Sequence, residues 1–218
     1  MPFKPKIVPL GDSALLVQLG AEIDLPINQR VHALANLMAA SSINGVIETV
    51  PAYATLLVHY DPLTLSYTQI KNIVREKMAQ IQENESRKPR LVEVTVQYGG
   101  KLGPDLDSVA SHCGLRIEDV IRIHSEKIYT IYMMGFTPGY PYMGKLDDVL
   151  ITPRLETPRT RVPAGTVAIA GSQTGIYSIE SPGGWNLIGW TPLKLFDPNS
   201  NSPFLFMPGD EVKFIPEN

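Results

Sequence analysis

Glycine is distributed very unevenly along this chain, and this asymmetry constrains the fold more than any other feature. Gly11, Gly20 and Gly45 are the only glycines in the first 90 residues, and the other 14 of the 17 lie downstream. Tight turns and close backbone contacts favour glycine because it lacks a Cβ atom. We therefore expect long, regular elements in the first part and short strands joined by demanding turns in the second.

The first 81 residues alternate between strand-like and helix-like patterns. Strand-like runs occupy Ala14–Val17 and Val46–Tyr60, the second of which is interrupted by Pro51. Two other segments repeat apolar residues at helical spacing, and the first of them opens at Asp24-Leu25-Pro26. The two apolar faces are Ile27, Val31, Leu34 and Met38, and then Ile70, Ile73, Val74 and Met78. This β-α-β-α order predicts a small α/β sandwich in which two helices cover one face of a sheet.

A charged and polar segment separates the two parts. Residues 82–90 read Gln-Glu-Asn-Glu-Ser-Arg-Lys-Pro-Arg and contain no large apolar side chain. Such a stretch is typical of a solvated linker. We therefore expect two domains, residues 1–88 and residues 89–218.

The second domain is expected to combine two short helices with many short strands. A strand over Leu91–Gln97 comes first. Asp105 is expected to cap a short helix that Gly114 closes, and a second helix is expected over Ile117–Ser125. The later strand-like segments are Ile128–Met134, Thr166–Ala170, Gly175–Ile179, Asn186–Ile188, Phe204–Met207 and Glu211–Ile215. Short strands separated by glycine and proline predict a closed or nearly closed β-barrel, so the fold class of the whole chain is α+β.

Charge and composition narrow the classes of partner. The net charge is −3 and the sequence pI is near 5.8, so no broad positive field attracts nucleic acid or an anionic membrane. The single cysteine, Cys113, excludes an internal disulfide, as expected in a reducing cytosol. No window approaches the roughly 18 uninterrupted apolar residues of a membrane helix. We expect a cytoplasmic protein with no nucleic-acid or membrane partner.

The residue types argue against a phosphate-binding loop and against a zinc site. Gly139–Lys145 has the spacing of a phosphate-binding loop, but Leu146 stands where such loops place serine or threonine, and Pro141 removes a backbone donor. The four histidines and Cys113 lack the spacing of zinc ligands, so no metal site is expected. His124 ends a predicted helix and is the candidate for an acid or base.

One run of ten residues, Gly135–Gly144, combines three glycines, two prolines and three aromatic residues. A rigid loop of this composition presents aromatic faces and bare backbone to a ligand, with Phe136, Gly139 and Tyr142 as candidates. The alternative is a barrel corner that is packed by its own aromatic side chains.

A second segment, Pro153–Gly165, carries Arg154, Arg159 and Arg161 on a stretch that prolines keep out of a helix. Arginine side chains recognise carboxylate or phosphate groups by two-point contacts. The alternative is a solvated loop in which Glu156 is the partner. A further turn, Ser181–Trp185, brings an indole that is suited to cover a pocket.

Taken together, these segments resemble the family of the bacterial 5-oxoprolinase B subunit. This family is also labelled allophanate hydrolase subunit 1, and it includes the Kip-type inhibitor of a sporulation histidine kinase. The resemblance is carried by the motifs in Gly135–Gly144, Pro153–Gly165, Ser181–Trp185 and Pro208–Phe214, and it covers nearly the whole chain. The pattern departs at Trp190, where the family leads us to expect arginine or histidine.

The resemblance implies a small α/β N-terminal domain followed by a cyclophilin-like β-barrel like a carboxyltransferase subdomain. It implies a hydrolase acting on a cyclic amide, which converts 5-oxo-L-proline to L-glutamate only in a complex with subunits A and C. ATP and magnesium are then co-substrates of that complex, and this chain holds no prosthetic group.

Two other functions remain open under the same resemblance. One is inhibition of a histidine kinase by direct binding. The other is carboxyl transfer to urea or a similar amide with a biotin-bearing partner.

The resemblance and the residue patterns together give a predicted site. His124 is the predicted catalytic residue. The predicted substrate-binding residues are Phe136, Gly139, Tyr142, Arg154, Arg159, Arg161, Gln173, Gly183, Gly184 and Trp185.

Overall fold

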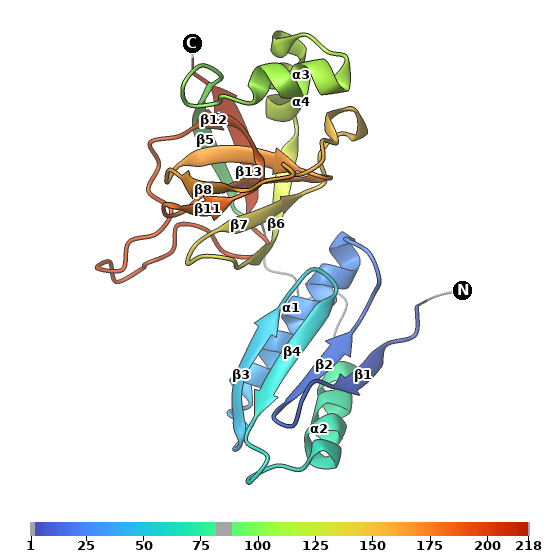
Figure 1. The fold of residues 1–218 in the computed structure, drawn as a ribbon. Helices are drawn as coiled ribbons and strands as arrows, with labels where there is room; N and C mark the ends of the chain where they lie inside the picture. The colour runs from blue at the N-terminus through green and yellow to red at the C-terminus, as the bar shows by residue number, and fades with distance from the viewer. Residues whose placement is uncertain (1–2, 82–88, 218) are drawn as a thin grey trace. The chain divides into compact units, whose positions relative to one another are not determined.

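The computed structural model of the chain divides into two compact units, residues 1–88 and 89–218 (Figure 1). The structure describes residues 3–81 and 89–217. The first unit is a layered α/β sandwich and the second contains a closed barrel, so the predicted fold class is confirmed. Residues 82–88 of the predicted linker lie outside the described residues.

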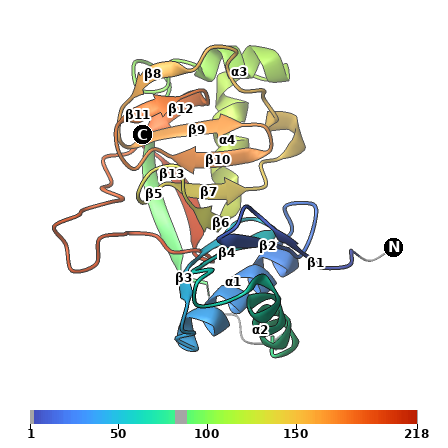
Figure 2. The same cartoon turned by 60° about the horizontal axis from the view of Figure 1, so that its bottom comes forward.

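The first unit is a four-stranded antiparallel sheet in the order β1-β2-β4-β3, with both helices on one face (Figures 1 and 2). Its elements are β1 (Lys6–Pro9), β2 (Ala14–Gln18), α1 (Leu25–Ala40), β3 (Val46–Pro51), β4 (Thr55–Tyr60) and α2 (Tyr67–Ala79). The strand-like run Val46–Tyr60 is therefore a hairpin, because the break after Pro51 turns the chain back.

Local hydrogen bonds begin both helices, the first of them at Asp24 as the sequence predicts. The Asp24 side chain accepts a hydrogen bond from the Ile27 N–H at 3.0 Å, and Ser66 with Gln69 forms a reciprocal capping box. The helices and the sheet then share one core. Its buried members include Leu15, Val17, Val31, Leu34, Leu56, Val58, Ile70 and Val74.

The second unit is a seven-stranded closed barrel in the order β10-β7-β6-β13-β5-β12-β9. Its strands are β5 (Leu91–Tyr98), β6 (Ile128–Met134), β7 (Pro141–Gly144), β9 (Thr166–Ala170), β10 (Gln173–Ile176), β12 (Asn186–Trp190) and β13 (Glu211–Pro216). β13 pairs with β5 in parallel, and the remaining pairs are antiparallel. A separate two-stranded ribbon joins β8 (Arg159–Val162) to β11 (Ser181–Gly183).

Three sequence expectations need correction in this unit. Phe204–Met207 is not a strand; only Phe204 bridges Phe196, and their rings stack. The end of the predicted aromatic loop is β7, because residues 141–144 pair with β6 on one side and β10 on the other. Part of the predicted arginine loop is likewise the strand β8.

Helices α3 (Leu106–Cys113) and α4 (Ile117–Glu126) lie together at one end of the barrel unit, and a short 3-10 helix spans Asp148–Leu150 (Figure 1). Gly114 ends α3 in the left-handed conformation at φ 65°, as predicted. Asp105 stands at the N-cap position but makes no capping hydrogen bond, because its carboxylate is used elsewhere.

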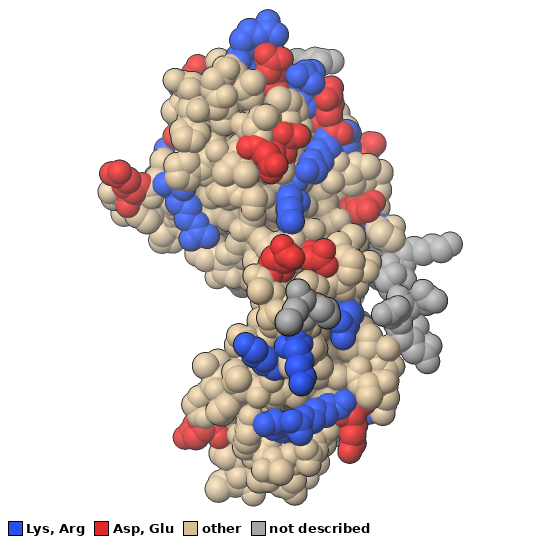
Figure 3. Space-filling model, turned by 90° about the vertical axis from the view of Figure 1, so that its right-hand side faces the viewer, with Lys and Arg blue, Asp and Glu red and all other residues tan. Residues whose placement is uncertain are grey.

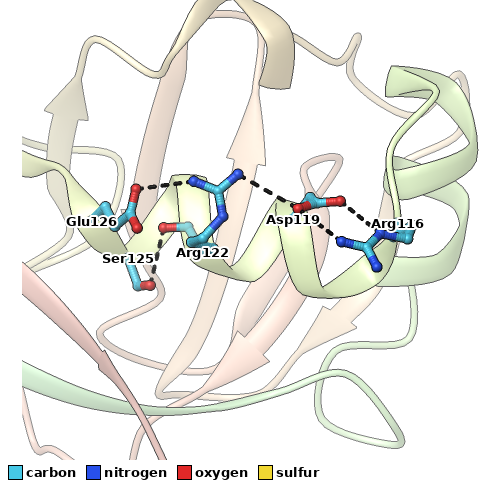
Figure 4. Close-up of polar contacts among 5 residues, drawn as sticks. All are labelled: Arg116, Asp119, Arg122, Ser125 and Glu126. Carbon is cyan, nitrogen blue, oxygen red and sulfur yellow. Dashed lines mark hydrogen bonds and ion pairs between the residues drawn. The ribbon is translucent and has the colours of Figure 1, made fainter.

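Charged side chains along the outer face of α4 form a chain of ion pairs (Figure 4). Asp119 lies between Arg116 at 2.9 Å and Arg122 at 3.5 Å, and Glu126 lies 3.2 Å from Arg122. The hydrogen bond from Arg116 lowers the pKa of the Asp119 carboxyl. These pairs keep one face of α4 in solvent, and the opposite face contributes Val120 to the barrel core.

The charge pattern differs between the two units. Lysine and arginine side chains gather on the visible face of the first unit, whereas both signs intermix on that of the barrel unit (Figure 3). Among the described residues, no helix has the length and apolar character needed to cross a membrane.

An ion pair fastens the start of β5 to the turn before β13. The Arg90 guanidinium lies 2.6 Å from the Asp210 carboxylate, whose side chain is fully buried. The Met207 N–H also donates to Asp210 at 3.0 Å. Arg90, the last residue of the polar segment 82–90, is therefore bonded into the barrel unit.

We predict that Arg90→Ala destabilises the barrel unit by about 3 kcal/mol, because it leaves a buried carboxylate without its counter-ion. Both tryptophans, Trp185 and Trp190, lie in this unit, so tryptophan fluorescence during urea unfolding reports on it alone.

Adding Asp210→Asn to the Arg90→Ala variant removes the buried charge and is expected to restore part of the loss. Arg116→Ala, which breaks an exposed ion pair, is the control and is expected to leave the midpoint unchanged. An Arg90→Ala midpoint equal to that of the wild type would contradict the assignment.

Candidate functional site

The barrel unit carries a pocket of about 170 Å³ that is lined mainly by aromatic side chains. The lining residues are Phe136, Tyr140, Tyr142, Arg154, Leu155, Pro158, Tyr177, Gly183, Gly184 and Trp185. Half of these residues carry aromatic rings, one carries a positive charge and none carries a carboxylate. The pocket is therefore suited to a small ring that bears a negative group.

Three segments that are distant in sequence build this pocket: residues 136–142, 154–158 and 177–185. The Leu155 N–H donates a hydrogen bond to the Gly184 carbonyl 2.8 Å away. This bond fastens the arginine-bearing segment to the end of the ribbon. Of the ten predicted substrate-binding residues, the structure brings six to the pocket: Phe136, Tyr142, Arg154, Gly183, Gly184 and Trp185.

Tyr140 is at the centre of the aromatic cluster. Its ring meets those of Tyr177 and Trp185 in T-shaped contacts, with centroids 5.3 and 6.0 Å away. Tyr142 and Phe136 flank it at 4.9 and 5.5 Å. Phe136 is 59% exposed and holds a left-handed backbone conformation with φ 64°. That conformation costs a residue with a side chain roughly 1–2 kcal/mol, and such strain is concentrated at functional sites.

Two glycines make room for the hydroxyls of two pocket tyrosines. A Cβ atom added at Gly183 would lie 2.0 Å from the Tyr177 hydroxyl oxygen, and one added at Gly175 would lie 2.6 Å from that of Tyr140. Both separations are shorter than a Cβ carbon keeps from an oxygen to which it is not bonded. Glycine at these two positions therefore lets the tyrosine rings approach the backbone closely enough to form the pocket wall.

Arg154 supplies the positive charge of the pocket. Its side chain is exposed, and among the described residues it forms no ion pair with a carboxylate. Burial raises the pKa of the Tyr142 hydroxyl, and the Arg154 guanidinium opposes that rise. The guanidinium therefore lies close enough to the pocket tyrosines to act on a ligand among them.

Arg159 is placed differently from its prediction as an anion contact. Its Nη2 lies 2.7 Å from Oδ1 of Asp105, and Oδ2 of Asp105 accepts the Leu187 N–H at 2.7 Å. Asp105 thus connects the ribbon strand β8 to the barrel strand β12, which explains why it does not cap α3. Arg159 is not among the lining residues, although its charge acts on the lining residue Tyr177, and its buried Nη1 has no hydrogen-bond partner among the described residues.

Three other predicted residues lie outside the pocket. Arg161 is exposed and paired with Glu180 at 2.7 Å, so the partner is not the predicted Glu156. Gly139 is buried with φ 79° and turns the chain into β7. Gln173 is half-buried on β10 opposite Gly144. Each has a structural reason for its place that needs no ligand.

His124 is fully buried in the barrel, outside the pocket. Its Nδ1 lies 2.7 Å from the Tyr98 hydroxyl, and its Nε2 lies 2.9 Å from Oγ1 of Thr174. Thr174 donates its own proton to the Ala168 carbonyl, so it accepts from Nε2–H, and Nδ1 accepts from Tyr98. Burial lowers the pKa of His124 to about 3. A neutral imidazole bonded at both nitrogens is a core residue, so we do not retain His124 as catalytic.

Sequence reasoning missed four lining residues, Tyr140, Leu155, Pro158 and Tyr177. Tyr140 lies in the aromatic run Gly135–Gly144, and Leu155 and Pro158 lie in the arginine segment Pro153–Gly165. The unusual composition of these segments was a signal that could have identified the three residues. No sequence signal identified Tyr177, because Gly183, which accommodates its hydroxyl, is six residues away and only the fold brings the two together.

The run with phosphate-loop spacing is not a loop, because Pro141–Gly144 is a barrel strand that pairs on both sides. Its backbone N–H groups are therefore directed into the sheet and not toward a phosphate. Within residues 3–81 and 89–217, no three histidine, cysteine, aspartate or glutamate side chains gather in an arrangement that holds a metal ion.

The carboxyltransferase domain, subdomain C and D, matches residues 5–206 of this chain. Together with the barrel, the ribbon and the aromatic pocket, this match defines the class of protein: a carboxyltransferase-type C and D domain protein. The solved structure of TTHA0988 superposes with a TM-score of 0.83 at 38% identity over 94% of this chain, which spans 40% of that longer chain.

Two curated relatives narrow the class further. The chain is 43% identical to the 5-oxoprolinase B subunit of Bacillus subtilis (strain 168), covering 99% of this chain and 94% of the relative. It is 40% identical to the 5-oxoprolinase B subunit of Escherichia coli O157:H7, covering 95% and 94%. The chain belongs to the family of the 5-oxoprolinase B subunit, so the resemblance found in its motifs is confirmed.

We predict that Gly183→Ala destabilises the barrel unit by about 1–3 kcal/mol, because the new methyl group collides with the Tyr177 hydroxyl. Gly184→Ala is the matched control, since its Cβ would meet only Pro158 at an ordinary 3.5 Å. Thermal unfolding followed by tryptophan fluorescence compares the two variants. Equal losses for both would contradict the close approach of Tyr177 to Gly183.

We also predict a pH dependence of stability that originates at His124. The unfolded histidine binds a proton near pH 6.5, whereas the buried ring does so only near pH 3. Between these values the unfolded state binds more protons, so stability falls as the pH falls, by about 1.4 kcal/mol per pH unit from this group. Urea unfolding of the wild type and His124→Gln, compared from about pH 7 to pH 4, measures the difference.

The difference in stability between the wild type and His124→Gln is expected to shrink as the pH falls. His112→Gln, at an exposed position on α3, is the control and is expected to follow the wild type. A constant difference for His124→Gln across the range would show that the buried ring is not neutral.

Proposed function

We propose that this chain is the pocket-bearing subunit of an ATP-dependent 5-oxoprolinase, which opens 5-oxo-L-proline to L-glutamate together with subunits A and C. The observation that carries the proposal is the aromatic pocket, which has no carboxylate among its lining residues and contains Arg154, a residue that forms no ion pair within residues 3–81 and 89–217. 5-Oxoproline is a flat five-membered cyclic amide with one carboxylate. Its ring matches the aromatic walls, and its carboxylate matches the guanidinium.

The size of the pocket supports an amide ligand over a nucleotide. Its volume of about 170 Å³ is below the roughly 300–1,000 Å³ of pockets for drug-sized ligands. A nucleoside triphosphate with magnesium is larger than the cavity and needs donors for three phosphates, whereas Arg154 is the one charged lining residue. We therefore assign ATP and magnesium to a site that is completed by a partner subunit.

Family membership supports the dependence on partners. The curated relatives are named as one subunit of an enzyme, and the pocket of this chain contains no carboxylate or histidine to move a proton. We propose that this chain binds and orients the cyclic amide, and that phosphorylation and ring opening require groups from subunits A and C.

The test is glutamate release from 5-oxoproline with ATP and magnesium, using this chain co-purified with its subunits A and C. We expect no release of glutamate when this chain is omitted. An equal rate without the chain would overturn it. If the chain does not assemble with those subunits, binding to the dimerisation domain of a histidine kinase is the function to measure next.

A second candidate, carboxyl transfer to an amide, is favoured by the description of the matching family model. It requires a biotin-bearing partner, which the oxoprolinase does not. Avidin added to the assembled complex separates the two, since only carboxyl transfer is expected to stop. Activity that persists with avidin and yields glutamate excludes this candidate.

We predict that Arg154→Ala raises the KM for 5-oxoproline by about tenfold or more, because it removes a charge-assisted contact to the carboxylate. Arg161→Ala is the control, since Arg161 is exposed, paired with Glu180 and outside the pocket. Steady-state kinetics of the complex give the KM for each variant. Equal KM values for Arg154→Ala and the wild type would remove Arg154 from the site.

A further inference from the structure

The Tyr177 side chain occupies an unusual position in the pocket wall. The residue is only 1% exposed, yet it lines the cavity, and its ring is held by T-shaped contacts with Tyr140 and Phe136. Gly183 leaves the space that its hydroxyl occupies. The hydroxyl is therefore fixed by packing before any ligand arrives.

The Tyr177 proton is available for a ligand. Burial raises the pKa of the hydroxyl, so the group stays protonated at neutral pH. The Trp185 backbone opposes that rise without reversing it, so the hydroxyl keeps its proton and is a donor. Among the described residues, no carbonyl, carboxylate or hydroxyl accepts the Tyr177 proton. Tyr177 and Gly183, against which the hydroxyl packs, both line the cavity, so a ligand oxygen in the cavity is the natural acceptor for this buried donor.

Arg154 and Tyr177, two of the polar donors among the lining residues, differ in depth. Arg154 is exposed at the rim, whereas Tyr177 is buried in the wall. Moving a carboxylate away from water costs far more than moving an amide carbonyl. A ligand that has both groups is therefore expected to keep its carboxylate at the rim and to place its carbonyl at the buried hydroxyl.

We infer that Tyr177 donates a hydrogen bond to the carbonyl oxygen of the cyclic amide, while Arg154 holds the carboxylate. This inference rests on the proposed function, because it takes a cyclic amide acid as the ligand. It makes Tyr177 the residue that distinguishes an amide ring from a hydrocarbon ring of the same shape. It also gives the ligand one orientation in the pocket.

The test compares three probes for binding to the full-length chain by ligand-observed NMR titration. 5-Oxoproline has both polar groups, 2-pyrrolidinone has the carbonyl alone, and cyclopentanecarboxylate has the carboxylate alone. Tyr177→Phe is expected to weaken the binding of 5-oxoproline and of 2-pyrrolidinone by about tenfold and to leave the binding of cyclopentanecarboxylate unchanged. Arg154→Ala is expected to weaken the binding of 5-oxoproline and of cyclopentanecarboxylate and to leave the binding of 2-pyrrolidinone unchanged.

Two further variants keep the test decisive. Gly183→Ala moves the Tyr177 hydroxyl without removing it, and it is expected to give the same selective loss if Tyr177→Phe does not fold. Tyr129→Phe is the control, because its hydroxyl donates to the His124 carbonyl in the barrel core, outside the pocket. It is expected to bind all three probes as the wild type does.

The outcomes separate this inference from the proposed function. If the assembled wild-type complex does not release glutamate from 5-oxoproline, the proposed function fails. If it does, and Tyr177→Phe binds all three probes as the wild type does, the inference about Tyr177 is overturned. If Tyr177→Phe weakens the binding of all three probes equally, the inference is also overturned, since that result indicates a changed pocket shape and not the loss of one hydrogen bond.

Discussion

The site depends on the space that glycine leaves beside an aromatic ring. Gly175 and Gly183 admit the hydroxyls of Tyr140 and Tyr177 at separations that no Cβ atom allows. The two tyrosines then pack edge to face and form the wall of the pocket. The glycine-rich second part of the sequence is thus more than a set of turns, because it permits backbone and aromatic side chains to meet closely.

Two carboxylates of the barrel unit connect segments that are distant in sequence, and no carboxylate is among the residues that line the pocket. Asp105 joins Arg159 of the ribbon to β12, and buried Asp210 joins Arg90 to the turn before β13. With these acids engaged elsewhere, Arg154 keeps its charge available at the pocket. This separation of charges supports the proposal of an acidic ligand.

His124 shows how a polar side chain is accommodated in an apolar core. Its ring stacks on Phe214 with centroids 4.6 Å apart, and hydrogen bonds to Tyr98 and Thr174 satisfy both nitrogens. The sequence placed this histidine at a helix end, where a protonated ring is favourable. Burial overrides that preference, because a charged imidazole in an apolar core has no water to solvate it.

Local sequence patterns were sufficient to predict the fold class and most of the elements. Helical spacing at Val31 and Leu34, the cap at Asp24 and the turn at Gly114 are local, so the pattern predicts them. Six lining residues were likewise predicted, because they lie in runs of unusual composition.

The tertiary structure was needed to show which arginine is available, which one is bound to Asp105, and that Tyr177 meets Gly183. Those facts depend on barrel closure and on contacts between distant segments. Periodicity along one strand or helix contains no information about them, because it reports only which face of that element is apolar.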